Sequence, residues 1–264
     1  MNSFYTLITA HTGSDNTLPN TLESVVTGME SGADFVEVDV RSTRDSVVVL
    51  FHDDHIVTRD SGEVRINDLT FSELNTLVIN NAISNSSITE IIKLEEAISI
   101  VKNYGGYLNV DIKDDTCITP MIKLIREADM VDSTIITGCK YSRASALKRE
   151  YPEFQVLLNL DKSLLLDTGK SPSMIADEIC HMAIEASCCG INIEFTYLSS
   201  ELIEAARRRF LPISIWTLTE NDNLEEYLNM GFYSITTTAV RSLVKKRKSY
   251  IQKTAFPGIW PDKI

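Results

Sequence analysis

The chain has 264 residues, of which 44% are hydrophobic and 23% charged, and its formal net charge at pH 7 is −12. These values are typical of a folded enzyme, and no apolar run approaches the ~18–20 residues that a membrane-spanning helix needs. Because nucleic-acid binding depends on clustered lysine and arginine, the acidic balance argues against a nucleic-acid partner. We expect one globular domain over residues 1–264, with no membrane insertion.

Short apolar strands alternate with amphipathic stretches of helical length along the chain. We predict strands near residues 6–10, 35–41 with a return strand at 47–52, 107–112, 134–138, 155–159, 190–194, 212–217 and 234–237. Helices are predicted near residues 21–31, 94–104, 118–128, 142–151, 173–187, 199–209, 221–230 and 240–252. This alternation predicts an α/β fold, a parallel sheet closed into a (β/α)8 TIM barrel, with a doubly wound open sheet as the alternative.

Single residues indicate where several of these elements begin and end. Three polar residues precede helical stretches and are expected to cap them: Ser142, Ser200 and Asn221. Three glycines lie where helices or loops lead into strands and are expected to end the preceding element: Gly32, Gly190 and Gly231.

Two segments depart from the alternation. Residues 53–91 are predicted to be a small insertion after the second strand, at the mouth of the barrel, with one short helix after Thr70. The tail, residues 255–264, contains two prolines and a glycine, which exclude a regular helix, and is predicted to pack across the outside of the barrel. The basic run Lys245–Lys248 is predicted to be a solvent-exposed face of the last helix.

The cysteines and the N-terminus bear on the compartment. The five cysteines are odd in number and lack the CxxC spacing of zinc sites, so we expect reduced, buried thiols. Residues 1–10 lack a basic leader and a long apolar segment, and are predicted to form the first strand instead of a signal peptide. Both observations favour a cytoplasmic protein.

Candidate catalytic residues lie at the carboxyl ends of the predicted strands, where barrel enzymes place their active sites. His11 follows the first strand, and His52 follows the return strand. Residues 35–40 alternate apolar and acidic side chains with period two, so Glu37 and Asp39 emerge on one face of their strand. Two acids that point the same way inside a barrel are costly without a cation.

The third strand adds an acid and a base, because Asp111 and Lys113 share one face. With Glu37 and Asp39, Asp111 would supply three hard oxygen ligands of the kind that Mg²⁺, Ca²⁺ or Mn²⁺ prefer. Lys113 could neutralise a phosphate oxygen, and histidines are the natural proton donors and acceptors near neutral pH. Two alternatives remain open. The acid pair could form salt bridges with Arg41 or Lys113, and Lys113 could be a plain ion-pair partner.

In order along the chain, these residues resemble the motifs of the glycerophosphodiester phosphodiesterases, which run H-R-G, P-E-N-T, E-x-D-V, H-D and E-x-K. This chain reads His11-Thr12-Gly13, Pro19-Asn20-Thr21, Glu37-Val38-Asp39-Val40, His52-Asp53 and Asp111-Ile112-Lys113. Three later stretches also fit the landmarks of that family: Leu94–Ala97, Ile215–Thr217 and Gly231–Thr237. The resemblance extends from residue 6 to about residue 240.

The resemblance implies a TIM barrel that binds one divalent metal ion, Mg²⁺ or Ca²⁺, and hydrolyses a small glycerophosphodiester to glycerol 3-phosphate and an alcohol. It implies that His11 and His52 are the general acid and base. It implies that Lys113 contacts the phosphate and that Trp216, at the end of strand seven, lines the glycerol side of the pocket. The metal ligands that it implies are Glu37, Asp39 and Asp111. Residues 53–91 match the insertion that separates these enzymes from the phosphatidylinositol phospholipases C.

The chain departs from the family pattern at four places. Thr12 replaces the arginine after the first histidine, and threonine cannot form the bidentate phosphate contact of arginine. The glutamate of P-E-N-T is missing, the late aspartate is Thr237 or Thr238, and Asp111 replaces a glutamate. Two alternatives to hydrolysis follow: a catalytically silent barrel that binds a phosphodiester, and a phosphodiester lyase or transferase. The sequence leaves the alcohol portion of the substrate and the oligomeric state undetermined.

Overall fold

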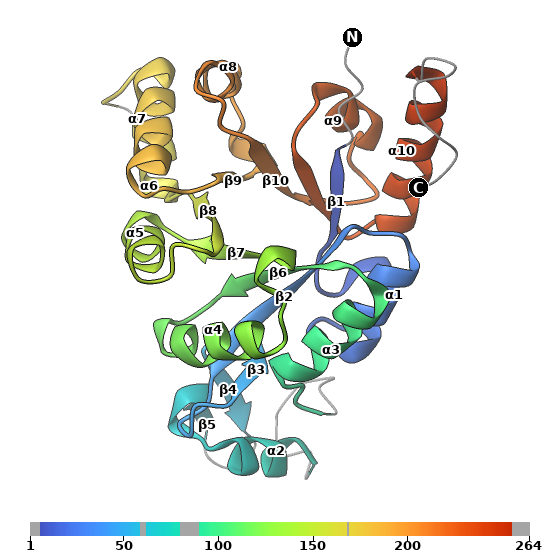
Figure 1. Ribbon diagram of the computed structural model, residues 1–264, viewed down its shortest axis with the longest axis vertical. Coiled ribbons are helices and arrows are strands. Elements are labelled where there is room, and N and C mark those ends of the chain that lie inside the picture. Colours follow the sequence, from blue (N-terminus) through green and yellow to red (C-terminus); the bar gives the residue numbers. More distant parts are fainter. Residues whose placement is uncertain (1–5, 59–61, 80–89, 168, 255–264) are drawn as a thin grey trace.

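A computed structural model of the protein describes residues 6–58, 62–79, 90–167 and 169–254. The described strands form a closed parallel barrel, the predicted TIM barrel, and not an open sheet. The barrel strands are β1 (Leu7–Ala10), β2 (Phe35–Ser42), β6 (Tyr107–Ile112), β7 (Thr134–Cys139), β8 (Gln155–Asn159), β9 (Gly190–Glu194), β10 (Ile213–Leu218) and β11 (Ser234–Thr237). The ring closes because β1 pairs in parallel with both β11 and β2 (Figure 1).

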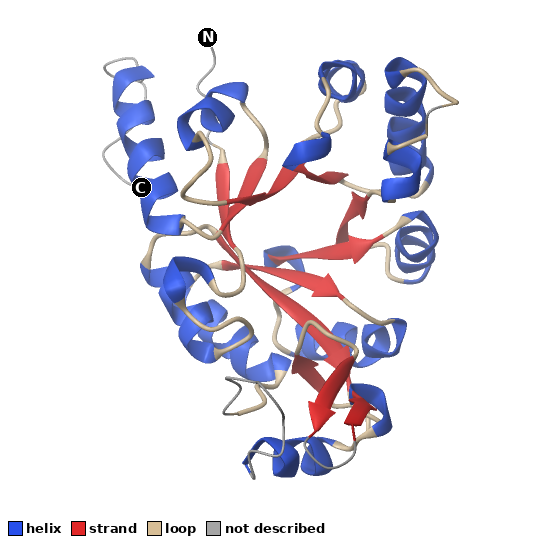
Figure 2. Ribbon diagram, turned by 180° about the vertical axis from the view of Figure 1, so that it is seen from behind, coloured by secondary structure: helices blue, strands red, loops and turns tan. Residues whose placement is uncertain are grey.

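Helices surround the barrel, as Figure 2 shows. They are α1 (Leu22–Glu30), α3 (Leu94–Tyr104), α4 (Ile118–Glu127), α5 (Tyr141–Glu150), α7 (Pro172–Glu185), α8 (Ser200–Arg208), α9 (Leu224–Met230) and α10 (Val240–Thr254). Each lies within three residues of a predicted helix at both ends. Two further helices, α2 (Phe71–Ile79) and the short α6 (Lys162–Leu165), lie outside this alternation.

The hydrophobic core fills the space between the strands and the helices. Alternate strand residues such as Ile8, Val38 and Val110 are fully buried in it. The intervening positions face the interior of the barrel, and there the strands carry buried polar side chains such as Thr9 and Asn192. The interior is therefore polar, whereas barrel interiors are usually filled by branched apolar residues.

The insertion between β3 (Val48–Leu50) and α3 has a small core of its own. β3 pairs antiparallel with the carboxyl end of β2, and a hairpin of β4 (His55–Thr58) and β5 (Gly62–Arg65) follows it. The hairpin and α2 pack on apolar residues that include Phe51, Ile66 and Leu74. The sequence predicted α2, and Thr70 caps it, because its hydroxyl accepts a hydrogen bond from the backbone N–H of Glu73 at 3.2 Å. It did not predict the hairpin.

The expected helix caps were wrong by one or two residues. Ser199, not Ser200, caps α8 by accepting from the backbone N–H of Leu202 at 3.1 Å. Asn223, not Asn221, caps α9, because a turn closed by Asp222 occupies the preceding residues. Helix α5 begins at Tyr141, so Ser142 lies inside it, and Lys140 at its N-cap makes no side-chain cap.

Two of the three glycines end helices as predicted. Gly32 and Gly231 adopt left-handed backbone conformations directly after α1 and α9, with φ of +86° and +74°. Gly190 instead begins β9, where a Cβ atom would lie 2.7 Å from the carbonyl oxygen of Pro212. It allows two strands to approach closely and does not end a helix.

The basic run in α10 is not a uniformly exposed face. Arg247 is only 5% exposed, and its guanidinium forms an ion pair with Asp34 and donates to the carbonyl oxygen of Thr6 at 3.1 Å. It fastens α10 to the loops around β1 and β2. The predicted packing of the tail, residues 255–264, concerns residues outside those that the structure describes.

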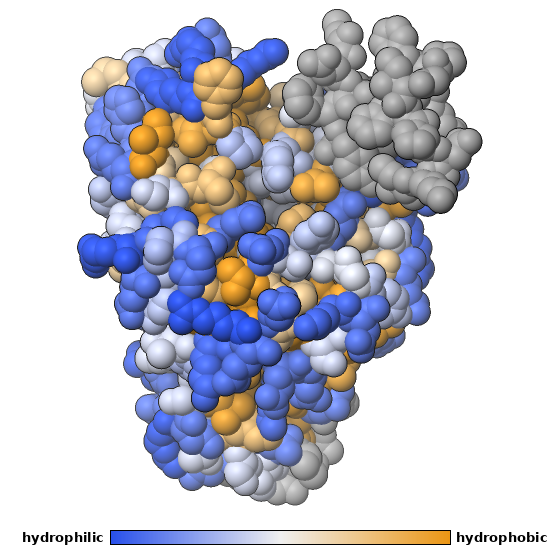
Figure 3. Space-filling view, in the orientation of Figure 1, coloured by the Kyte–Doolittle hydropathy of each residue, from blue (hydrophilic) through white to orange (hydrophobic). Residues whose placement is uncertain are grey.

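The surface carries scattered apolar residues, of which Phe210 is 94% exposed. Figure 3 shows one face on which hydrophilic side chains surround smaller hydrophobic areas. Within the described ranges, no helix is long and apolar enough to cross a membrane.

Candidate active site

Three carboxylates meet at the carboxyl ends of neighbouring strands. Glu37 and Asp39 lie on β2, Asp111 lies on β6, and Asp39 and Asp111 are direct register partners. One oxygen from each of the three carboxylates lies within 4.8 Å of the other two. Glu37 and Asp39 are 5% and 3% exposed, so this cluster is removed from bulk water. The period-two alternation of residues 35–40 explains the shared face of the pair.

Lys113 contributes a positive charge to this cluster. Its Nζ lies 2.9 Å from Oδ1 of Asp39 and 3.2 Å from Oδ2 of Asp111. Burial would lower the pKa of Lys113, but the two carboxylates outweigh that effect and raise it. Lys113 is thus an ion-pair partner of two candidate metal ligands, Asp39 and Asp111. A phosphate bound at these ligands would also lie beside its ammonium group.

The three carboxyl groups differ in their electrostatics. Burial raises the pKa of Glu37 well above its usual value, and the charges of Asp39 and Asp111 add to the rise. Burial also raises the pKa of Asp111, although Lys113 opposes the increase. For Asp39, burial is outweighed by Lys113 and by the amide of Asn20, so its pKa is lowered. The site favours a cation, because three carboxylates this close destabilise one another when ionised.

Asn20 and Thr12 hold the acid pair in place. The amide Nδ2 of Asn20 donates to Oδ2 of Asp39 at 2.9 Å, and its Oδ1 accepts from the backbone N–H of Asp39 at 3.1 Å. The backbone N–H of Thr12 donates to Oε2 of Glu37 at 2.9 Å, and the Thr12 hydroxyl accepts from the backbone N–H of Asn20. The sequence analysis noted Asn20 only as part of a motif and missed its contact with Asp39.

His11 extends from the end of β1 beside these residues. Its Nδ1 lies 2.7 Å from the carbonyl oxygen of Thr12. A carbonyl oxygen only accepts, so Nδ1 carries the proton in this contact, and a neutral His11 ring presents an unprotonated Nε2. The neighbouring backbone N–H of Thr12 binds Glu37. His11 is thereby tied to the acidic cluster through one residue.

His52 lies just after β3 and is exposed at the site. Its Nδ1 contacts Oδ1 of Asp53 at 2.8 Å, and 66% of its side chain is exposed. A charge on its ring would add to the lowering of the Asp39 pKa and oppose the rise of the Asp111 pKa, so the ring lies near both carboxylates. His52 thus approaches the carboxylates as the return strand predicts. The Asp53 side chain is itself 76% exposed and accepts a hydrogen bond from the ring of His52.

Trp216 belongs to the other side of the barrel mouth. It is the register partner of Glu194 between β10 and β9, and both side chains face the interior. Its indole N–H is buried and has no hydrogen-bond partner among the described residues. The aromatic ring and a free donor in this position can contact a ligand in the mouth.

Gly138 supports Asp111 from the neighbouring strand. Its φ is +73°, and a Cβ atom there would lie 2.1 Å from Oδ1 of Asp111. The register between β7 and β8 shifts at this point, which marks an irregularity of the bulge type. A glycine inside a predicted strand is the signal that could have indicated such an irregularity, and the sequence analysis did not use it.

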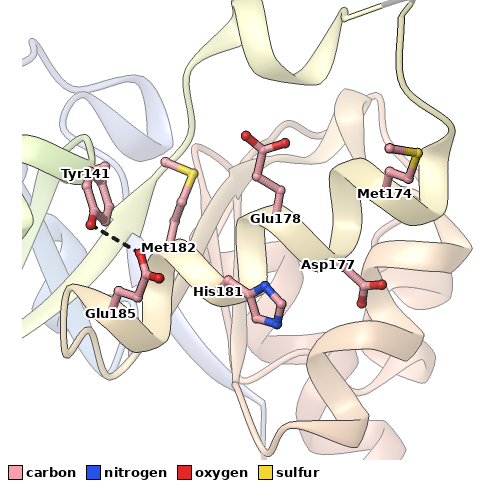
Figure 4. A pocket seen from close by; sticks show the side chains of 7 residues that line it. All are labelled: Tyr141, Met174, Asp177, Glu178, His181, Met182 and Glu185. Carbon is pink, nitrogen blue, oxygen red and sulfur yellow. Dashed lines mark hydrogen bonds between the residues drawn. The ribbon is translucent and has the colours of Figure 1, made fainter.

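A groove on the outside of the molecule lies apart from these residues. It has a volume of about 620 Å³ and is formed by α5 and α7, with Met174, His181 and Glu185 among its lining residues (Figure 4). None of the candidate site residues lines it. The carboxylate cluster, and not this groove, is the candidate active site.

Comparison with known proteins identifies the family of the chain. Residues 11–241 match the sequence pattern described as the glycerophosphoryl diester phosphodiesterase family. The chain belongs to this family. A glycerophosphodiester phosphodiesterase of Caldanaerobacter subterraneus is 24% identical over 246 residues, which cover 90% of this chain and 96% of that protein.

Solved structures of the family share the fold. One is a glycerophosphodiester phosphodiesterase from Thermotoga maritima, with 21% identity, a TM-score of 0.70 and coverage of 91% of this chain and 97% of the other. Another is an Oleispira antarctica phosphodiesterase in complex with the product sn-glycerol-3-phosphate, with 20% identity, a TM-score of 0.71 and coverage of 93% and 98%. At these identities the likeness shows the common barrel.

Within this family, Thr12 stands where the pattern has arginine. Its backbone N–H and hydroxyl are both engaged with Glu37 and Asn20, so residue 12 still holds the acid pair. Threonine supplies no guanidinium at this position. Among the described residues, Lys113 is the cation that forms ion pairs with the cluster.

Proposed function

We propose that this protein is a metal-dependent phosphodiesterase that hydrolyses glycerophosphodiesters to glycerol 3-phosphate and an alcohol. The observation that carries the proposal is the cluster of Glu37, Asp39 and Asp111, with oxygens within 4.8 Å of one another, in a chain of this family. The product complex of the Oleispira antarctica relative supports the same substrate class.

The donor set fits one divalent cation. Three ionised carboxylates and the ammonium of Lys113 leave two formal negative charges, which one Mg²⁺ or Ca²⁺ would neutralise. Carboxylate oxygens are the ligands that both ions prefer. When bound by Glu37, Asp39 and Asp111, such an ion would supply electrostatic stabilisation for the phosphate oxygens as charge develops on them. Burial raises the pKa of Glu37, and the charges of Asp39 and Asp111 add to the rise, so a bound cation would favour its ionised form.

His11 and His52 are the proposed acid and base. The neutral His11 ring presents an unprotonated Nε2, because the carbonyl oxygen of Thr12 holds the proton on Nδ1. That nitrogen can remove a proton from an attacking hydroxyl or water. The Nδ1 of His52 contacts Asp53, which leaves Nε2 to deliver a proton to the leaving alcohol oxygen. Proton transfer of this kind contributes roughly 10²–10⁴ in rate.

Lys113 and Trp216 are the proposed substrate contacts. Lys113 would contact the phosphate while remaining paired with Asp39, and Trp216 would line the glycerol side of the pocket. The buried, unpartnered indole N–H of Trp216 supports a ligand there, because buried donors are normally paired.

The proposal includes the setting of the enzyme. We expect residues 1–264 to act as one domain, in which residues 53–91 are a small insertion at the mouth of the barrel. The five free cysteines support a reducing, cytoplasmic compartment.

The test is to incubate the protein with glycerophosphocholine and Mg²⁺, Ca²⁺ or chelator, and to follow products by phosphorus NMR. We expect metal-dependent glycerol 3-phosphate that His52→Ala abolishes. His55→Ala is the matched control, because His55 also pairs with a neighbouring aspartate, Asp54, but belongs to the hairpin. A cyclic phosphate as the final product would indicate a lyase instead.

A second candidate function is a silent barrel that binds phosphodiesters without turnover. Thr12 favours it, because the missing guanidinium weakens contact with the phosphate. Binding of glycerophosphocholine in the presence of metal, with no product from any diester, would support this alternative and overturn the first.

A further inference from the structure

Opposite the acidic cluster, the mouth of the barrel holds a second charged residue that faces inward. Glu194 ends β9, and three strands separate β9 from β2 in either direction around the ring. A diester whose phosphate lies at Asp39 and Asp111 has two arms, and with the glycerol on the β11 side of Trp216 the alcohol portion would extend across the mouth on its β9 side. Trp216 lies directly beside Glu194 in the register.

An ammonium group of the chain itself occupies the space in front of Glu194. The Nζ of Lys162, on the short helix α6, lies 3.3 Å from Oε2 of Glu194 and 5.5 Å from the centre of the Tyr197 ring. The hydroxyl of Thr196 donates to Oε1 of Glu194 at 2.8 Å, which fixes the carboxylate. Ammonium-binding sites typically combine a carboxylate with the face of an aromatic ring, and Glu194 and Tyr197 supply both around this ammonium.

Lys162 is held there weakly. Its side chain is 65% exposed, whereas that of Glu194 is 27% exposed. The hydrogen bond and charge of Glu194, together with Tyr197, raise the pKa of Lys162, so the group that occupies the site is charged. Exposed lysine–carboxylate pairs contribute little to stability, and a lysine arm of this length moves into water at small cost.

We propose that Glu194 and Tyr197 bind an ammonium group on the alcohol portion of the substrate, at the place that the Lys162 ammonium occupies in the free protein. This inference rests on the proposed phosphodiesterase function and adds the class of alcohol. Lys162 competes with the substrate for the site and is a specificity-determining residue.

Lys162 could instead contact an anionic group of the substrate. Removal of Lys162 would then weaken substrate binding, whereas removal of a competitor strengthens it. Lys162→Met deletes the competitor, so kcat/KM for glycerophosphocholine should rise about threefold relative to that for glycerophosphoglycerol, whose alcohol is neutral. Glu194→Gln should lower the same ratio about tenfold, the size of a partly desolvated cation–carboxylate and cation–π contact. An anion contact would lower kcat/KM for both diesters in Lys162→Met.

The matched control is Lys140→Met. Lys140 is also 65% exposed, and it is paired with Asp161 in the adjacent loop at 2.7 Å. Its removal changes the charge of the protein by the same amount without touching Glu194. We expect the ratio of the two diesters to change by less than about twofold in this variant.

A binding measurement separates this inference from the hydrolase proposal. Choline chloride alone, titrated while protein NMR or tryptophan fluorescence is recorded, should bind more tightly to Lys162→Met than to the unaltered protein, and about tenfold more weakly to Glu194→Gln. If no diester is hydrolysed but choline binds in this order, the hydrolase proposal fails and the ammonium site stands. Equal choline binding by all three proteins, or a lower choline preference in Lys162→Met, overturns the ammonium site.

Discussion

Replacing Gly138 by alanine is expected to damage the acidic cluster without changing any of its residues. A Cβ atom at this position would lie 2.1 Å from Oδ1 of Asp111, 2.5 Å from the carbonyl oxygen of Ile112 and 2.8 Å from its nitrogen. The clash with Ile112 involves backbone atoms, so a change of rotamer cannot relieve it. Either β7 moves away from β6, or Asp111 leaves the cluster.

The magnitude has two parts. A residue with a Cβ atom at a φ of +73° costs ~1–2 kcal/mol of backbone strain, and overpacking adds ~1–3 kcal/mol. Gly105→Ala isolates the first part, because Gly105 has a φ of +66° and nothing within 4 Å of the added carbon. The free energy of unfolding of Gly138→Ala should therefore fall below that of Gly105→Ala by roughly 1–3 kcal/mol.

The assay is urea unfolding of both variants with chelator, followed by titration of Mg²⁺ or Ca²⁺ into the folded proteins. We expect Gly138→Ala to lose stability in excess of Gly105→Ala and to bind the metal more weakly. If the two variants are equally stable and bind metal equally well, the position of Asp111 does not depend on a bare backbone at residue 138, and the reasoning is refuted.

Two further predictions concern buried charges. In chelator, Glu37→Gln should raise the free energy of unfolding at neutral pH. In the folded protein, burial and the neighbouring acids raise the pKa of Glu37 well above its usual 4.5. The protonated carboxyl therefore stabilises the fold below pH 4.5, and this stabilisation is lost as the pH rises from 4.5 through the raised pKa. Urea unfolding across this range should give a flatter pH dependence for the variant; parallel curves would contradict it. Arg247→Met should cost ~3–5 kcal/mol, because Asp34 loses its buried cation. Lys248→Met, on the exposed side of α10, should cost under ~0.5 kcal/mol in the same measurement, and equal losses would refute the distinction.

The local spacing of apolar and polar residues was sufficient to predict the barrel. Strand and helix positions follow from apolar runs of strand length and from helical amphipathicity, which depend on neighbours in the sequence. The shared face of Glu37 and Asp39 follows from the same rule, and Asp111 joins them because adjacent parallel strands place equivalent positions side by side. The position of His52 near the acid pair could be predicted, because a tight turn after β2 leads into the antiparallel strand β3, which runs back along β2.

Contacts between distant segments could not be predicted in this way. The approach of Gly138 to Asp111 depends on an irregularity in the pairing of β7, which no periodicity encodes. The burial of Arg247 depends on Asp34, which lies 213 residues earlier and reaches α10 only because the barrel closes. The cap of α8 was misplaced for a smaller reason, since two adjacent serines offer the same hydroxyl and only the backbone geometry selects Ser199.

The replacement of arginine by Thr12 changes what the rest of the site must do. The resemblance implies two tasks for residue 12, to hold Glu37 through its backbone and to contribute a charge through an arginine side chain, and threonine performs only the first. Lys113 cannot fully replace the missing charge, because Asp39 and Asp111 already share its ammonium. In the proposed phosphodiesterase, a divalent cation would balance the negative charge that Lys113 leaves on the cluster. In that proposal, the substrate contacts far from the phosphate, at Glu194 and Trp216, would carry a larger share of the binding free energy.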